Sequence, residues 1–450
     1  MRIACVQLRA RDVDEADLAL EEALEATDRA ASDADLVVLP EATFPGYVLH
    51  GNVRFGSDGY ERACVSFGDL ARRHAAWIAV GLVRPVEGGL ANSAVLLDTD
   101  GNVAAVTDKA FLWHFDSRWF RPGTPGGVIA LPWGAAGMFV CADARMTEIP
   151  RRLAVNGARL LLDPTALVLS PLGKNAQLEY MLSARAWENG AFLAVANKCG
   201  SEAGIARYGG SSAIFDPSGV RLSEAGPDDP AIVFADVHLP DAPGPRARPA
   251  RESVRELMVP TDSLPIAEAL AGPPPAAPFR VAMVRERVDP RRMATELGVD
   301  LVIGRHVSGT DGAVSLENGG FRVGDTVYRS GEILRCEAAT IGLVAGDDGA
   351  APEVMRALML RGANVLVWDG TGVDVPTFVL RTRADENRAF LVMLSARDRW
   401  QILGPTGQLI GEGPIDGLDA VYVEFALALA WQKEMAPGTD IVRDRPVGTG

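Results

Sequence analysis

The sequence is poor in the residues that hold metals and disulfides. It has five cysteines and five histidines among 450 residues, and they form neither a closely spaced cysteine pair nor an HxH or HExxH cluster. Disulfide frameworks and zinc sites need such spacings. We therefore expect no disulfide framework, no metal and no cofactor.

Long apolar runs and an excess of positive charge are also missing. No run reaches membrane-spanning length, and the N-terminal residues 1–7 suggest a first strand rather than a signal peptide. The net charge of −15 argues against nucleic acid or an anionic membrane as a partner. We therefore expect a cytoplasmic protein that acts on a small molecule.

Lysine is rare as well. Only four of the 44 basic residues are lysine, namely Lys109, Lys174, Lys198 and Lys433. A GC-rich coding bias would produce the same excess of arginine. Even so, arginine cannot replace a compact ammonium whose pKa responds to burial, so Lys109 is a stronger functional candidate here than in an ordinary sequence.

The composition is that of a folded chain, with 48% hydrophobic and 23% charged residues, and its length favours two domains. Residues 1–239 alternate short strands with helical stretches, the first over 14–31, which predicts an α/β domain. Residues 240–278 are rich in proline and predict an extended linker, with a short helix near 251–258. A second folded segment covers 279–450.

This second segment looks like a shortened copy of the first. Six segments match in the same order, among them residues 137–143 with 342–348 and 185–193 with 383–391. The reactive groups do not recur, because His306 stands at the position of Glu41 and Gly346 at that of Cys141, and no lysine occurs from 279 to 432. We expect His306 to be structural.

Three groups in the first segment suggest chemistry. Glu41, Lys109 and Cys141 each follow a predicted strand, and Cys141 lies on a strand-to-helix turn. Such turns hold a nucleophile out of the sheet and into a crevice. A carboxylate, an ammonium and a thiol placed in this way would make an acyl-transfer site.

The stretches around these residues resemble three motifs of the nitrilase, or carbon–nitrogen hydrolase, superfamily. They are residues 39–47, 109–123 and 141–151, in the family's order. The resemblance implies a four-layer αββα sandwich, here repeated in tandem with a shortened, degenerate second copy, and a Glu41–Lys109–Cys141 triad. The family often has a second glutamate seven residues after the lysine; here that residue is Asp116, which implies a helper role for it.

The resemblance also implies a mechanism. Glu41 would take the thiol proton, Lys109 and the Ala142 N–H would stabilise the oxyanion, and a thioester would form on Cys141. An aspartate at the third position, as in Cys141-Ala142-Asp143, is typical of amide rather than nitrile hydrolases. We therefore expect an amide or carbamoyl substrate, and the residues expected to bind it are Tyr47, Trp113, His114, Ala142, Arg145 and Thr165.

Several alternatives remain open. Arg145 could bind a substrate carboxylate, or brace Glu148 or Asp143. The enzyme could hydrolyse a nitrile, or transfer the acyl group to an amine, and a binding pseudoenzyme is a further alternative. A glutaminase that feeds a synthetase is disfavoured, because the second half has no Gly-rich phosphate loop before a helix. We expect the second copy to complete an intramolecular pseudo-dimer, with or without further homo-oligomerisation.

Overall fold

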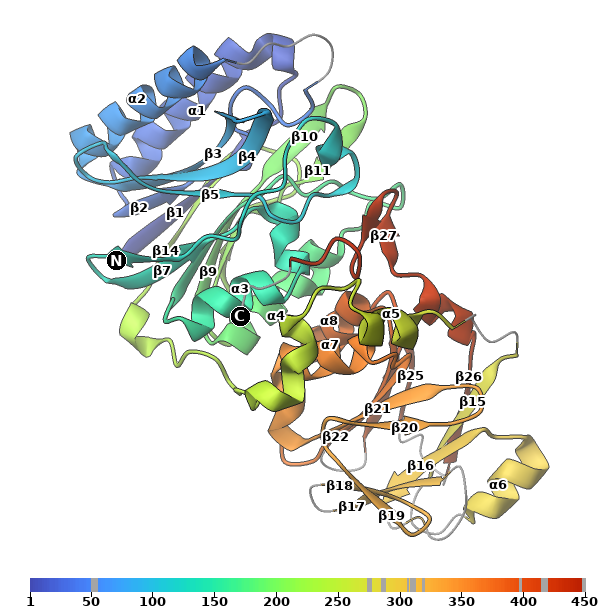
Figure 1. Cartoon of the computed structure of the whole chain (residues 1–450). Coiled ribbons are helices and arrows are strands. Elements are labelled where there is room, and N and C mark those ends of the chain that lie inside the picture. Colours follow the sequence, from blue (N-terminus) through green and yellow to red (C-terminus); the bar gives the residue numbers. More distant parts are fainter. Residues whose placement is uncertain are drawn as a thin grey trace. The chain divides into compact units, whose positions relative to one another are not determined.

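The computed structural model describes residues 1–49, 56–272, 277–284, 289–305, 307, 313–317, 320–395, 399–413 and 420–446. The chain forms two compact units (Figure 1). The first consists of Met1–Pro245 with the segment Ala436–Thr439, and the second is mainly Arg246–Met435. His306, expected to be structural, lies outside the described residues.

The first sheet of the first unit carries the N-terminal strand at its centre. Its order is β11 (Ala206–Gly209), β10 (Lys198–Glu202), β1 (Arg2–Arg9), β2 (Leu36–Val38), β3 (Trp77–Val86), β4 (Gly89–Leu97) and β5 (Val103–Asp108), and β14 (Ala231–Asp236) also pairs with β1. Strands β1, β2 and β3 are parallel. Helices α1 (Ala16–Ala31) and α2 (Ser57–His74) pack on this sheet.

Helix α1 agrees with the predicted first helix, preceded by a 3-10 turn at Val13–Glu15. Its buried side chains include Leu20, Ala23, Thr27 and Ala30, which recur at the spacing of one helical face.

The second sheet of this unit has the order β13 (Arg221–Glu224), β12 (Ala213–Phe215), β9 (Phe192–Ala196), β8 (Leu160–Pro164), β7 (Gly134–Met138) and β6 (Val128–Leu131). Strands β7, β8 and β9 are parallel, and β8 and β9 are buried along their whole length, as expected for central strands. Helices α3 (Glu148–Val155) and α4 (Leu182–Asn189) pack on it. Because β1 also packs on β9 and β3 on β8, the unit has four layers in the order αββα.

Among its described residues, the second unit has two sheets of six strands each. One has the order β19 (Thr326–Arg329), β18 (Gly320–Val323), β17 (Ala313–Glu317), β16 (Leu301–Arg305), β15 (Phe279–Val284) and β26 (Ala420–Phe425). The other has the order β20 (Glu332–Arg335), β21 (Thr340–Ala345), β22 (Val365–Gly370), β23 (Phe390–Ser395), β24 (Trp400–Leu403) and β25 (Leu409–Gly413). Helix α6 (Pro290–Leu297) packs on the first, and α7 (Pro352–Leu360) and α8 (Thr377–Asn387) pack on the second.

The proline-rich stretch is less extended than the sequence predicts. It contains the expected short helix as a 3-10 segment at Arg251–Met258, and also α5 (Leu264–Leu270), which the sequence analysis did not predict. The first of these packs on α7 and the second also contacts α7. Proline at the second position of α5 is compatible with a helix start, because the first-turn N–H groups have no intrahelical partner. Among the described helices, none is long and apolar enough to cross a membrane.

Candidate active site

Glu41 is fully buried beyond the end of β2. Its segment runs closely along β3, where Gly81 N donates to Pro40 O at 3.1 Å and Thr43 N donates to Gly81 O at 2.8 Å. A Cβ atom at Gly81 would lie 2.3 Å from the Pro40 carbonyl oxygen. This close approach therefore requires glycine at position 81, and it fixes the backbone that carries the carboxylate.

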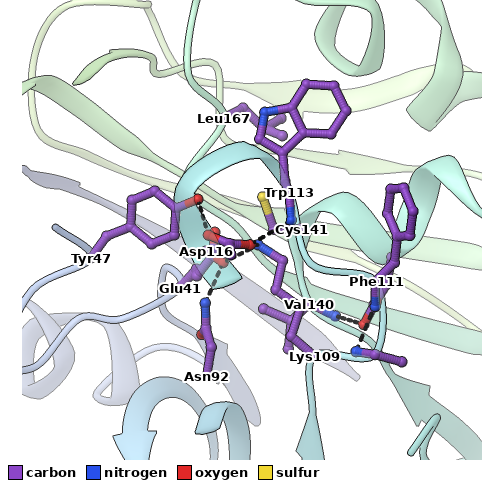
Figure 2. A network of polar contacts seen from close by, with 12 residues as sticks. Glu41, Tyr47, Asn92, Lys109, Phe111, Trp113, Asp116, Val140, Cys141 and Leu167 are labelled. Atoms are coloured by element: carbon purple, nitrogen blue, oxygen red, sulfur yellow. Dashed lines mark hydrogen bonds and ion pairs between the residues drawn. The ribbon is translucent and has the colours of Figure 1, made fainter. Parts of the chain in front are cut away.

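Lys109 directly follows β5 and bridges two carboxylates (Figure 2). Its Nζ lies 2.7 Å from Glu41 Oε1 and 2.7 Å from Asp116 Oδ2. All three side chains are 0% exposed. Removing three ionic groups from water is costly unless each is paired, and here the ammonium pairs with both carboxylates.

Asp116 reaches the lysine although its side chain is one methylene shorter than the glutamate of the family pattern. It lies in a short 3-10 helix at His114–Arg118, which carries its backbone toward the lysine. Its Oδ1 accepts the Tyr47 hydroxyl at 2.5 Å, and its Oδ2 accepts Trp113 N at 2.8 Å. The structure thus brings Asp116 together with Glu41 and Lys109.

The two oxygens of Glu41 have different surroundings. Oε1 accepts Lys109 Nζ at 2.7 Å and Asn92 Nδ2 at 2.6 Å. Oε2 is buried and has no hydrogen-bond partner among the described residues. That oxygen is free to accept a proton.

Cys141 begins the turn that follows β7 and is 5% exposed. Its φ of +54° is uncommon for a residue with a side chain, and such strain often occurs at functional sites. Two contacts hold the turn, since Cys141 N donates to Asp163 Oδ1 at 2.8 Å and Gln177 Nε2 donates to Cys141 O at 2.9 Å. The next amide, Ala142 N–H, has no acceptor within the described part of the chain.

The charges around the thiol set its protonation. Burial raises the pKa of the Cys141 thiol well above its ordinary value; the nearby Glu41 carboxylate adds to this rise and Lys109 opposes it. For Lys109, burial works against the charged form, but Asp116 and Glu41 outweigh it, so the pKa is raised well above its ordinary value. The resting site therefore holds a neutral thiol beside an ammonium.

Asp143 links the cysteine turn to the lysine segment. Its Oδ1 accepts Ala110 N at 3.0 Å and Phe111 N at 2.7 Å, and its Oδ2 accepts Val140 N at 3.1 Å. Burial raises the pKa of Asp143 to about 7, although the three N–H donors act in the opposite direction. The third residue of the Cys141-Ala142-Asp143 sequence thus holds two reactive segments in register.

The residues expected to bind substrate lie in different surroundings. Tyr47, Ala142 and Thr165 are buried, and the Thr165 carbonyl accepts Glu41 N at 3.3 Å. Trp113 is partly exposed, and the Arg145 guanidinium carbon lies 4.5 Å from the centre of its ring. Figure 2 shows Trp113 and Tyr47 around the same network as Cys141.

Arg145 and His114 make contacts that the sequence does not reveal. Arg145 is 7% exposed and its Nε donates to Gln177 Oε1 at 3.0 Å. The His114 side chain is exposed and packs edge-on against Phe115, with ring centres 5.0 Å apart. The backbone N–H of His114 donates to Thr439 Oγ1 at 2.7 Å, within the segment Ala436–Thr439 of the first unit.

Four polar residues of this site were not predicted: Asn92, Asp163, Gln177 and Thr439. Asn92 lies inside a buried strand, where an amide needs a partner, and Asp163 ends the apolar run of β8. A polar residue within such a run is a signal that could have identified both. Gln177 begins a π-helical turn at Gln177–Met181, a feature that single-sequence patterns do not mark.

Comparisons with known proteins agree with this arrangement. The carbon-nitrogen hydrolase family model matches residues 2–243. The "hydrolase in pqqF 5′ region" of Pseudomonas protegens is 33% identical over 210 residues, which cover 45% of this chain and 72% of the relative. An (R)-stereoselective amidase of a Pseudomonas species is 30% identical over 231 residues, covering 51% of this chain and 82% of the relative.

Among solved structures, an amidase from a Nesterenkonia species is 30% identical, with a TM-score of 0.49, over 54% of this chain and 92% of that one. The family match covers more than half of the chain, and it includes Glu41, Lys109, Asp116 and Cys141. The chain therefore belongs to the carbon–nitrogen hydrolase family, as an amidase-type hydrolase.

Proposed function

We propose that the protein hydrolyses the carbon–nitrogen bond of a small amide or carbamoyl compound through a thioester on Cys141. The observation that carries this proposal is the buried network in which Lys109 Nζ lies 2.7 Å from both Glu41 and Asp116, beside a thiol on a strained turn. Nucleophile, base and cation are the parts that acyl transfer requires.

In the first step, the Cys141 sulfur attacks the amide carbonyl carbon and its proton passes to Glu41. The free oxygen Oε2 supports this role for Glu41. The raised pKa of the thiol favours proton transfer during the attack over a preformed thiolate. Lys109 and the unpartnered Ala142 N–H donate to the carbonyl oxygen as it becomes an oxyanion.

In the second step, the carbon–nitrogen bond breaks. Glu41 returns the proton to the leaving nitrogen, which departs as ammonia or an amine. Glu41 then takes a proton from water, whose oxygen attacks the thioester carbonyl. The acid is released and the proton returns to the thiol.

An amide is favoured over a nitrile. The (R)-stereoselective amidase among the relatives supports this choice, and so does the contact of Asp143 with the lysine segment, since this aspartate marks amide hydrolases in the family resemblance. The Arg145 guanidinium stacks on Trp113 and bonds Gln177, which favours a bracing role over recognition of a substrate carboxylate.

The test is ammonia release and intact mass on a panel of small amides, carbamoyl amino acids and nitriles. We expect turnover of amides by the wild type, a mass increase equal to the acyl group, and loss of both in Cys141→Ala. Cys336→Ala is the matched control, because Cys336 lies in the second unit. It should behave like the wild type.

The other outcomes identify the alternatives. Turnover of nitriles alone would reject the amide assignment. Product formation that requires an added amine such as hydroxylamine would make the protein an acyl transferase. A Cys141 that neither turns over any compound nor reacts with iodoacetamide would favour a binding pseudoenzyme.

We also propose that the second unit is an inactive copy of the first. Its support is topological, because strands β20 to β25 repeat the order and the directions of β6, β7, β8, β9, β12 and β13, and the register shift between the last two strands recurs. Buried ion pairs recur as well, at 2.6 Å for Arg185–Glu188 and 2.9 Å for Arg383–Glu386.

The copy lacks the reactive groups. Gly346 has the φ of +54° found at Cys141 and also begins a five-residue turn, but it carries no side chain. Trp368 is fully buried and its Nε1 donates to Gly346 O at 2.9 Å. In a Cys141→Ala background, we expect Gly346→Cys to be alkylated by iodoacetamide without hydrolysing any amide. The pseudo-dimer stays a prediction, tested by whether residues 1–245 alone stay monomeric and active.

A further inference from the structure

Besides Arg185–Glu188, another buried ion pair of the first unit lies outside the network of Lys109. Lys198 and Glu202 both lie on β10, with Lys198 Nζ 3.2 Å from Glu202 Oε2. Lys198 is 4% exposed and Glu202 is 0% exposed. Buried pairs of this kind contribute little net stability, because the desolvation of both charges offsets their attraction. The hydrogen-bond partners of Lys198 and Glu202 indicate the role of this pair.

Glu202 holds one end of the loop that follows Glu41. Its Oε1 accepts Tyr47 N and Val48 N, both at 2.6 Å, and its Oε2 accepts the Tyr208 hydroxyl at 2.8 Å. The loop comes so close that a Cβ atom at Gly46, where φ is +149°, would lie 3.1 Å from Glu202 Oε1. The Glu202 carboxylate thus fixes the conformation of the backbone around Tyr47.

Lys198 holds the other end of the same loop. Its Nζ donates to Ala42 O at 3.1 Å, and Ala42 directly follows Glu41. The φ of Ala42 is +43°, a conformation that residues with a side chain adopt only when their surroundings impose it. The ammonium contact is one such constraint.

The two ends of the loop lead to the two carboxylates that bind Lys109. One end carries Glu41 itself, and the other carries Tyr47, whose hydroxyl bonds Asp116 Oδ1 at 2.5 Å. We propose that Lys198 and Glu202 are a positioning pair, which sets Glu41 for proton transfer and Asp116 for its contact with Lys109. This inference rests on the proposed amidase function. A misplacement of about 1 Å at a catalytic group can cost about a hundredfold in rate.

The test uses Glu202→Gln, Lys198→Met and the double variant, all in the full chain. In Glu202→Gln the amide oxygen can still accept Tyr47 N and Val48 N, but the NH₂ group then faces the Lys198 ammonium. We expect kcat to fall about 10- to 100-fold while KM changes less than about threefold. The pH dependence of kcat/KM should also shift, because the proton acceptor has moved.

The double variant separates positioning from stability. Methionine and glutamine remove both charges at similar volume, so thermal stability should recover toward the wild type. The rate should not recover, because methionine cannot donate to Ala42 O. Recovery of kcat together with stability would overturn the proposal and leave the pair a purely structural role.

Glu386→Gln is the matched control. Glu386 forms the buried pair with Arg383 in the second unit and is likewise 0% exposed. It should lower thermal stability without changing the pH profile. If it changes that profile as Glu202→Gln does, the effect is general and the proposal fails.

The alkylation rate of Cys141 distinguishes this inference from the proposed function. Iodoacetamide needs proton transfer from the thiol but no turnover, so the rate can be measured even if no amide is hydrolysed. We expect Glu202→Gln to slow alkylation about tenfold. If the wild type hydrolyses none of the amides but Glu202→Gln still slows alkylation, the proposed amidase function is rejected and the positioning role of Lys198 and Glu202 is supported. Unchanged alkylation would reject the pair.

Discussion

Replacing Asp116 by asparagine tests whether the shortened side chain in the lysine segment belongs to the catalytic network. Asp116 accepts three contacts: Lys109 Nζ at 2.7 Å, the Tyr47 hydroxyl at 2.5 Å and Trp113 N at 2.8 Å. Asparagine has one acceptor oxygen. If that oxygen stays on Tyr47, the new NH₂ group faces two donors, the ammonium and the Trp113 amide.

The magnitude follows from these contacts. A hydrogen bond to a charged group is worth about 1.5–3 kcal/mol and a neutral one about 1 kcal/mol. Both lost contacts involve the charged carboxylate, so we expect the free energy of unfolding to fall by at least about 3 kcal/mol. Lys109 would also move toward its remaining partner, Glu41. Because an oxyanion donor is worth about 100- to 1,000-fold in rate, we expect kcat to fall at least about 100-fold.

The assay combines chemical denaturation with ammonia release, and Asp116→Glu is the matched variant. Glutamate keeps the charge but adds a methylene to a fully buried site, which costs about 1–3 kcal/mol. Its stability should therefore fall comparably, while its rate should exceed that of Asp116→Asn. The reasoning is refuted if Asp116→Asn keeps kcat within about threefold of the wild type, or if both variants lose the same rate.

Three further predictions concern the surroundings of the network. Gly81→Ala should destabilise the first unit in thermal melts and lower kcat in ammonia assays, because its Cβ would lie 2.3 Å from Pro40 O. Gly127→Ala is the control: its Cβ would meet nothing within 4 Å, so neither stability nor kcat should change. Arg145→Met should raise KM by the same factor for neutral and carboxylate-bearing amides; a larger rise for the latter in steady-state kinetics would assign Arg145 to substrate recognition. Asp143 should make stability fall as pH rises, because folding raises its pKa from about 3.9 to about 7. Between these two pH values the folded state binds more protons than the unfolded state, so the free energy of unfolding should drop by up to about 1.4 kcal/mol per pH unit. Denaturation of Asp143→Asn should lack that slope, and an equal slope in both proteins would contradict the assignment.

Much of the first unit was predictable because its signals are local. The apolar runs of β7 and β8 and the helical spacing of α1 indicate their structures directly, and the family model match confirms the relationship that the motifs indicated. The Pro-rich stretch was harder, because proline content suggests an extended chain. Proline is nevertheless compatible with the start of α5, which contacts α7.

The supporting residues of the site depend on contacts that no local pattern records. Glu202 meets Tyr47 and Val48 across 155 and 154 positions, and His114 meets Thr439 across 325. Such contacts form only when the chain has folded. The scarcity of lysine was nevertheless a useful signal: it pointed to Lys109, and it also applies to Lys198, which lies within hydrogen-bond distance of the residue after Glu41.

The charge balance of the site constrains how it can work. Four carboxylates are buried in this region, those of Glu41, Asp116, Asp143 and Asp163, and the Lys109 ammonium contacts two of them. Burial raises the pKa of Asp143 to about 7 and that of Asp163 well above its ordinary value. Burial thus shifts these two carboxyl groups toward the protonated form, whereas Glu41 and Asp116 are in contact with the Lys109 ammonium.

When neighbouring carboxyl groups have different pKa values, they can take different roles in a reaction. Asp163 accepts a hydrogen bond from Cys141 N, and Asp143 accepts one from Val140 N. A protonated carboxyl group can still accept these hydrogen bonds, so both residues can hold the cysteine turn. Of these four acids, all within the described residues, Glu41 alone combines contact with the ammonium and a buried oxygen without a hydrogen-bond partner. In the proposed mechanism, the thiol proton would move to that oxygen and the negative charge of Glu41 would be replaced by that of the oxyanion, so Lys109 would remain paired throughout the reaction.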